Sequence, residues 1–396
     1  MSAPLERAVA QKKEAIEAAM EMFERGAEVL ASAVGELLPL CTAAAPVLRL
    51  ALHNVQSKEV FYVKEQFLAV RSRLDVLSGQ LDDVDGELRR SRLDARYFGV
   101  EENVRNQFRK YMDILEAKPE FHAVKTRLFR EHFARTGGEK NLHVLYEAVM
   151  GLNSFGESVL DVVERYVSRD RRLLEDFCVR LKELFCLGLI ALLGHVALTR
   201  EDEEDEKIQD WSGRIDQVES KMKAAIEACV AAFPEQAQTD AERLLKERDG
   251  QELPDVAQAL REFLAGKYDW VSWSVRVINH AGSTYRKWRA GEHFHHVAGR
   301  NWFEVLQVNN VNLVVSYREG AAAPQKVPRD LIQQLMEGPG RKGNAQAVVE
   351  VLEKQLGGFV VHAVSRHKES TAAWSFPEES HYWERHKNVA VCVHPE

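Results

Sequence analysis

The chain has 396 residues, 45% of them hydrophobic and 29% charged, with a formal net charge of −8. This length favours two domains, and this composition is typical of a globular, helix-rich protein. The acidic balance excludes the usual kind of nucleic-acid-binding protein, which needs a basic surface.

The first part of the chain predicts amphipathic and small apolar helices. Residues 4–25 carry apolar side chains near one helical face. Residues 26–53 are small and apolar, and Pro39 and Pro46 interrupt them. Because proline removes a backbone donor, we expect two short helices around a bend.

A long apolar seam follows over residues 58–92, which predicts one long helix. Its members recur at alternating steps of three and four residues, the heptad spacing of coiled-coil helices. They are Val60, Val63, Phe67, Val70, Leu74, Leu77, Leu81, Val84 and Leu88.

Shorter helices are predicted between residues 100 and 168. One carries an apolar stripe at Phe121, Val124, Leu128 and Phe133, which we assign to its buried face. The Gly137–Gly138 pair is a plausible C-terminal cap for this helix. A further break is predicted near Ser168.

The most informative stretch is LFCLGLIALLGHVAL, residues 184–198, which holds no formal charge. As a helix it would be about 22 Å long, whereas a hydrocarbon core is about 30 Å thick. It is therefore either the central helix of a soluble bundle or a membrane-active element that is normally hidden. The candidate residues for this core or membrane role are Leu184, Leu187, Leu189, Ile190, Leu192 and Leu193.

A second seam occupies residues 207–233 and ends at Pro234. Its members are Ile208, Trp211, Ile215, Val218, Met222, Ala225, Cys229 and Phe233. Two such seams can bury one another, so we expect this helix to lie antiparallel beside residues 58–92. Helical patterns then continue to about Gly266.

From Tyr268 onward, Val, Trp and Phe alternate in a pattern typical of strands. This part holds 15 basic and 13 acidic residues, a balance of +2, so the rest carries 38 minus 48, or −10. The predicted fold is mainly α: an elongated multi-helix bundle with long coiled-coil-like helices over residues 1–266. A smaller α+β domain is predicted over residues 267–396.

Candidate chemistry is sparse. The run EHFHH, residues 292–296, offers imidazoles, but it lacks the spacing of a zinc site, so we expect structural or surface histidines. The run GPGRKGN, residues 338–344, lacks the strand and helix that frame a phosphate loop. We therefore predict a non-enzymatic protein with no catalytic residue, cofactor or metal.

The cysteines and the N-terminus favour a cytoplasmic protein. The five cysteines are odd in number and show no short-range pairing pattern, which predicts buried thiols in a reducing compartment. The first twenty residues alternate charge and have no apolar core like that of a signal peptide.

Four long strings resemble the rapunzel proteins of fish, which are related to the cephalotoxin-like group. The strings are NQFRKYMD (106–113), TGGEKNLHVLYEAVMGLNSFGESVLDVVERYV (136–167), RRLLEDFCVRLKELFCLGLIALLGH (171–195) and KYDWVSWSVRVIN (267–279). The resemblance implies a role in the growth of fins and skeleton without a known catalytic activity. It supplies no catalytic or binding residues to carry over.

Together these observations predict an interaction scaffold that binds an unknown protein partner or a second copy of itself. The alternative is a conditional membrane-binding or α-helical pore-forming protein, in which the apolar segments 26–53 and 184–198 meet a membrane. Neither hypothesis calls for nucleic acid.

Overall fold

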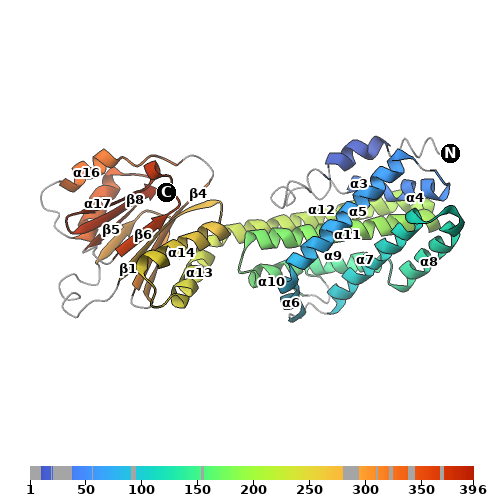
Figure 1. Ribbon diagram of the computed structural model, residues 1–396, viewed down its shortest axis with the longest axis horizontal. Coiled ribbons are helices and arrows are strands. Elements are labelled where there is room, and N and C mark those ends of the chain that lie inside the picture. Colours follow the sequence, from blue (N-terminus) through green and yellow to red (C-terminus); the bar gives the residue numbers. More distant parts are fainter. Residues whose placement is uncertain are drawn as a thin grey trace. The chain divides into compact units, whose positions relative to one another are not determined.

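The computed structural model describes residues 10–18, 20, 38–55, 57–90, 95–152, 156–279, 294–308, 311–320, 324–337, 344–365 and 370–396. It divides into two compact units, a helical unit from Met1 to Ala231 and an α+β unit from Ala232 to Glu396 (Figure 1). The predicted fold class, mainly α with a smaller α+β part at the C-terminus, is confirmed.

The helical unit is a bundle whose described helices follow one another through short connections (Figure 1). They are α3 (Leu38–Thr42), α4 (Ala44–Leu52), α5 (Lys58–Gln80), α6 (Asp82–Arg90), α7 (Ala95–Glu116), η2 (Pro119–Phe121), α8 (His122–Arg135), α9 (Lys140–Met150), α10 (Val159–Tyr166), α11 (Arg171–Thr199), η3 (Glu201–Glu203) and α12 (Glu204–Ala231).

Helix α11 is the centre of this unit. It packs against α3, α4, α5, α7, α9, α10 and α12. Two glycines permit the closest approaches: a Cβ at Gly188 would lie 2.4 Å from Leu142, and one at Gly194 would lie 2.4 Å from Tyr111. These two glycines of the apolar segment thus serve close helix packing.

The first apolar seam is buried or half-buried from Val60 to Val84, but its helix is not continuous. Helix α5 ends at Gln80 and α6 begins at Asp82, with Leu81 as the C-cap between them. The predicted single helix over residues 58–92 is therefore wrong at this point. Gly79, two residues before the break, weakens the last turn of α5 by roughly 1 kcal/mol relative to alanine.

The predicted pairing of the two seams is also wrong. Helices α5 and α12 both pack on α11 instead of forming a main contact with each other. Each seam does face the core, as the burial of Phe67, Leu74, Trp211 and Val218 shows. The spacing of apolar side chains identified the buried faces correctly, but not the helix that covers them.

The apolar segment 26–53 is described only from residue 38, and residues 26–37 lie outside the described part. Helices α3 and α4 meet at Ala43, which confirms the predicted bend. Pro39 and Pro46 each occupy the first turn of their helix, where no intrahelical partner exists for the missing N–H.

Local capping signals explain the other boundaries. Gly137 and Gly138 have φ values of 93° and 53°, and the Gly138 N–H donates to the Phe133 carbonyl at 2.8 Å. This is the C-terminal cap predicted for α8. Ser168, with a φ of 50°, confirms the break before α11, and the Asp170 carboxylate caps the next helix.

The α+β unit contains two four-stranded antiparallel sheets and four described helices (Figure 1). The first sheet has the order β3-β4-β1-β6 and the second has the order β2-β5-β8-β7. The elements are α13 (Phe233–Glu247), α14 (Leu253–Lys267), β1 (Val271–Asn279), β2 (His295–Ala298), β3 (Trp302–Val308), β4 (Val311–Glu319), α16 (Arg329–Glu337), α17 (Ala345–Gln355), β5 (Phe359–Ser365), β6 (Ser370–Trp374), η5 (Glu378–Ser380), β7 (Tyr382–His386) and β8 (Val389–Pro395).

The two sheets repeat one pattern. Each half of this unit runs through two α-helices and then four strands. Each sheet consists of the third, fourth and first strands of one half, in that order, followed by the second strand of the other half. The second strand of each half joins the other half's sheet, since β2 pairs with β5 and β6 pairs with β1. The unit is thus a strand-exchanged internal repeat, in which neither half completes a sheet alone.

The boundary between the units falls earlier than the predicted 266/267 division. Helices α13 and α14 pack on the first sheet, and the buried cluster there includes Phe233, Leu264, Tyr268 and Trp273. The division therefore comes at Ala231–Ala232, where Pro234 stops the preceding helix and starts α13. Helical periodicity alone could not show that these two helices cover a sheet.

Candidate functional site

The six residues predicted as core or membrane candidates all lie on α11 and are at most 4% exposed. An 18-residue window of this helix has a mean hydropathy of 1.8 and is 83% buried. The helix is long and apolar enough to cross a membrane by length and composition, and here it is the core helix of the bundle.

The described part of the apolar segment 26–53 lies beside the apolar segment 184–198 in this core. Helices α3 and α4 pack on α11, where the Cys41 Sγ lies 3.5 Å from the Cys186 Sγ. The Tyr111 hydroxyl, from α7, donates to the Ala44 carbonyl at 2.8 Å. All five cysteines are free and buried, as predicted.

The N-terminal half of α11 carries buried charges that sequence analysis missed. The Arg180 guanidinium donates to Asp85 at 2.5 Å and to Glu101 at 2.8 Å, which joins α11 to α6 and α7. Arg105 in turn donates to Glu101 and Asp75, which adds α5. Breaking such a buried pair leaves an uncompensated charge and costs about 3–5 kcal/mol, so this network fixes how four helices meet.

Glu183 is a buried carboxyl at the start of the apolar segment. The Arg73 Nε lies 3.3 Å from its Oε1, yet neither carboxyl oxygen accepts a hydrogen bond among the described residues. Burial raises the pKa of Glu183 to about 8, and this desolvation outweighs the attraction of Arg73 and Arg105. Near neutral pH the side chain is therefore largely protonated.

Glu183→Gln is expected to flatten the pH dependence of the helical unit's stability. The folded pKa exceeds the unfolded value of 4.5, so stability is full below pH 4.5 and is lost as pH rises through about 8. The glutamine side chain cannot ionise, so the variant should gain on the order of a few kcal/mol over the parent between pH 5 and pH 9. Urea unfolding followed by circular dichroism measures this difference.

Glu131→Gln, at an exposed site on α8, is the matched control and should leave the pH dependence unchanged. An equal decline in stability with pH in the parent and in the Glu183→Gln variant would contradict the assignment of a buried, protonated carboxyl.

Helix α8 and its N-cap residue Phe121, the last residue of η2, present an apolar stripe to solvent instead of burying it. Phe121, Val124 and Leu128 are 53%, 46% and 40% exposed, whereas Phe129 and Phe133 are buried. The assignment of Phe121, Val124 and Leu128 to the buried face is therefore wrong. The two inward phenylalanines are four residues apart, and they set the buried face about a third of a turn away from Phe121, Val124 and Leu128.

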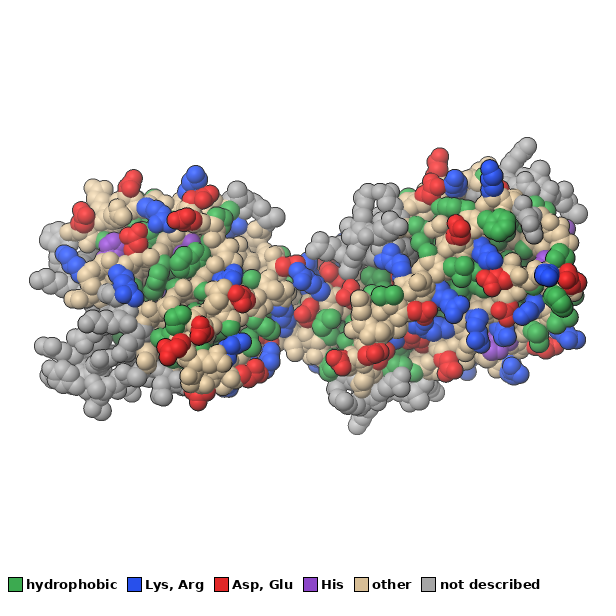
Figure 2. Space-filling model, in the orientation of Figure 1, with side chains coloured by type: hydrophobic (Ala, Val, Ile, Leu, Met, Phe, Trp, Pro, Cys, Tyr) green, Lys and Arg blue, Asp and Glu red, His purple; other side chains and the backbone are tan. Residues whose placement is uncertain are grey.

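Helix α5 shows a second exposed stripe outside its buried seam. Phe61 is 56% exposed, Leu68 is 37% exposed and Val76 is 59% exposed. Green side chains lie among blue and red ones over α5 in Figure 2. The sequence held a signal for this stripe, because all three residues fall outside the heptad positions of the seam.

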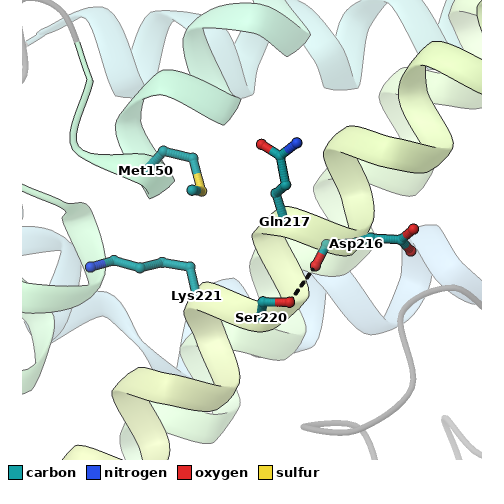
Figure 3. A pocket seen from close by; sticks show the side chains of 5 residues that line it. All are labelled: Met150, Asp216, Gln217, Ser220 and Lys221. Carbon is teal, nitrogen blue, oxygen red and sulfur yellow. Dashed lines mark hydrogen bonds between the residues drawn. The ribbon is translucent and has the colours of Figure 1, made fainter.

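A shallow pocket of about 370 Å³ lies between the end of α9 and the middle of α12 (Figure 3). The Ser220 hydroxyl donates to the Asp216 carbonyl at 2.8 Å, and the Lys221 ammonium lies 3.7 Å from Asp161. The polar groups in this pocket are thus held by neighbouring helix atoms. Its lining is Met150, Asp216, Gln217, Ser220 and Lys221.

The α+β unit holds a polar cluster within its core. Arg276, on β1, is fully buried, and its Nη1 donates to the Ser274 and Ser316 hydroxyls at 2.9 Å each. The same Nη1 lies 3.2 Å from the Cys392 Sγ of β8. His394 hydrogen bonds to Ser316, which also joins the second sheet to the first.

Two nitrogens of this buried guanidinium have no hydrogen-bond partner among the described residues, namely Nε and Nη2. Both ring nitrogens of His362, on β5, are likewise without one. Burial, followed by repulsion from Arg276, holds the pKa of His362 well below its ordinary value. Burial also lowers the pKa of His381 to about 2 and that of His394 to about 3.

Acid is expected to destabilise the α+β unit through these histidines. Their folded pKa values lie below the unfolded 6.5, so stability is full above pH 6.5 and falls as the pH drops below it. The loss should be about 1.4 kcal/mol per pH unit for each group, because every unit of pKa difference carries that energy. Imidazole signals of His381 and His394 in NMR spectra should stay in the neutral form at pH 5. Charged imidazoles at that pH in the folded protein would contradict the assignment.

The described histidines do not form a metal centre. No group of three or more His, Cys, Asp or Glu side chains suited to a metal ion occurs in the described part of the chain. Of the predicted run EHFHH, only Phe294, His295 and His296 are described, and the two histidines belong to the short strand β2. The run GPGRKGN lies outside the described residues except for Asn344, which caps α17.

Comparison with known proteins assigns the helical region to a family. The model of the cephalotoxin-like middle helical domain matches residues 54–250. Protein rapunzel of Danio rerio is 34% identical over 201 residues, which cover 50% of this chain and 88% of the relative. The chain belongs to the rapunzel and cephalotoxin-like family. No solved structure matches it at a significant level.

The family domain contains the candidate surfaces on α5 and α8 together with the whole of α11. Three of the four strings that carry the resemblance to rapunzel proteins fall within its span. The buried polar cluster around Arg276 lies beyond residue 250 and is therefore outside the domain that this family model matches.

Proposed function

We propose that this chain is a non-enzymatic, cytoplasmic interaction scaffold that self-associates through α5. The observation that carries the proposal is the exposed apolar stripe of Phe61, Leu68 and Val76 on a helix whose opposite face is anchored to α11. Exposed apolar side chains that line up on one face are typical of a protein contact. The growth of fins and skeleton, which the family resemblance implies, is the proposed biological setting.

The exposed face of α5 is complementary to itself in antiparallel orientation. About Leu68, Phe61 lies seven residues before and Val76 eight residues after, so each would meet the other in a second copy. Glu65 lies three residues before and Arg71 three residues after, so opposite charges would also meet. A twofold-symmetric dimer requires this self-complementarity, because the same patch serves both partners.

The double variant Phe61→Gln/Leu68→Gln is expected to weaken self-association at least tenfold. Both side chains are exposed in the single chain, so the fold should survive while the dimer loses its apolar contact. Sedimentation equilibrium measures the association constant. Phe121→Gln/Leu128→Gln on α8 is the matched control, with the same residue types at a similar exposure.

A charge exchange tests the antiparallel geometry. Glu65→Arg alone and Arg71→Glu alone should each weaken the dimer, because like charges would then face each other. The two changes together should restore it. A monomeric parent protein at high concentration, or a combined variant no better than the single ones, would contradict self-association through α5.

A second candidate function is conditional membrane insertion of α11, and one observation favours it. Glu183 is the carboxyl that precedes the apolar segment 184–198. Burial raises its pKa to about 8, so most Glu183 side chains are already uncharged at neutral pH. A charged residue at a bilayer centre costs about 2.5–3.5 kcal/mol or more, so protonation lowers this barrier. The other buried charges, such as Arg180, oppose insertion of the N-terminal half.

The insertion hypothesis predicts that Leu189→Ser abolishes dye leakage from acidic liposomes while most helix content remains. A hydroxyl in the middle of the apolar segment removes part of the transfer free energy that insertion needs. Leakage that survives this change, or a parent protein that causes no leakage between neutral and acidic pH, would exclude this role for α11.

A further inference from the structure

The outward face of α8 combines apolar and basic side chains. Its stripe of Phe121, Val124 and Leu128 is spaced by three and four residues, so the three side chains line up along the helix. Because Phe129 and Phe133, about a third of a turn away, anchor the helix in the core, the stripe is presented by a fixed helix.

Basic residues flank this stripe on both sides. At 100° per residue, Lys125 lies about 70° to one side of it and Arg127 about 90° to the other, and Arg135 lies at its C-terminal end, whereas Arg130 is exposed farther round the helix. Residues 118–135 hold five basic residues, Lys118 included, and two acidic residues, in a chain of net charge −8. One of the two acids, Glu131, lies 3.8 Å from Arg127 as an ion pair.

The lowered pKa of a neighbouring histidine is consistent with a positive electrostatic potential at this surface. The pKa of His132, on α8, is lowered first by burial and then by repulsion from three cations. These cations are Arg135 on the same helix and Lys110 and Arg109 on α7. Helix α7 also carries Asp113, which pairs with Lys110 at 3.6 Å and with Lys125 of α8 at 3.4 Å, so Arg109 is the cation by which α7 extends the basic surface of α8. Figure 2 shows green and blue side chains together over this part of the helical unit.

We propose that α8 docks flat on anionic membrane surfaces, with its apolar stripe between the headgroups and its basic flanks on the lipid phosphates. A bilayer interface offers an apolar layer beneath a negatively charged one, which matches the order of groups across this face. Long lysine and arginine side chains can bury their methylenes there and keep their charge at the headgroups. This docking goes beyond scaffolding, and it leaves α11 folded in the bundle.

Cosedimentation of the full chain with vesicles tests the proposal. Vesicles of phosphatidylcholine with about 30% phosphatidylserine should bind the protein at least tenfold better than phosphatidylcholine alone, because each surface cation adds attraction. Raising the salt from roughly 0.05 to 0.5 M should remove most of this binding, because screening shortens the reach of the charges.

Variants separate the two contributions. Phe121→Gln/Leu128→Gln should lower the vesicle partition coefficient at least tenfold, and Lys125→Gln/Arg127→Gln should lower it at least fivefold. The apolar control is Leu152→Gln/Leu306→Gln, after α9 and on β3, and the charge control is Arg243→Gln/Lys246→Gln on α13. Both controls change exposed apolar or basic residues outside α8 and outside the α5 stripe, and they should alter binding less than twofold.

Several outcomes would overturn the proposal. One is equal binding to vesicles with and without phosphatidylserine, and another is no binding to either. If the α8 variants and the control variants lose vesicle binding equally, the protein does not bind the membrane through α8. If Phe121→Gln/Leu128→Gln instead lowers the sedimentation mass of the protein, the stripe is a contact between chains. The α5 proposal is judged by sedimentation alone, so either proposal can fail without the other.

Discussion

Helix α11 is buried around its whole circumference between Leu184 and Leu193, and the helical unit is arranged to satisfy that requirement. A helix that is apolar on every side must be covered on every side. Helices from both ends of this unit, from α3 to α12, therefore contact it. Gly188 and Gly194 let α9 and α7 approach closely enough to close the core.

The same helix also carries charge into the core, and this limits how the bundle can be assembled. Arg180 needs Asp85 and Glu101, so α6 and α7 can occupy only the positions at which those carboxylates reach the guanidinium. Apolar packing tolerates many exchanges of similar volume. A buried charge does not, because an unpaired partner is strongly destabilising. The apolar half of α11 thus supplies most of the burial, and its charged half fixes the arrangement.

Sequence periodicity predicted the fold class, most helices and the buried faces of α5 and α12, because each of these depends on residues close in sequence. It did not predict that both seams pack on α11, since a seam shows where a helix is apolar and not what covers it. The strands β2, β6 and β7 were not predicted because each is only four or five residues long, and β2 and β6 pair with the other half of the repeat. The cluster around Arg276 joins this residue to Cys392, 116 positions away, and no local pattern marks it. The stripe on α8 was assigned to the core because exposed and buried apolar residues have the same spacing.

The central claim is that α11 is the structural centre of the helical unit, and native-state hydrogen exchange tests it most directly. If every other helix depends on α11, its amides between Leu184 and Leu193 should open only with global unfolding of the unit. They should therefore exchange most slowly and share one free energy of opening. Amides of α8 and of the outer turns of α5 should exchange earlier. Exchange in α11 that is faster than in the surrounding helices, or that occurs by separate local openings, would contradict the claim.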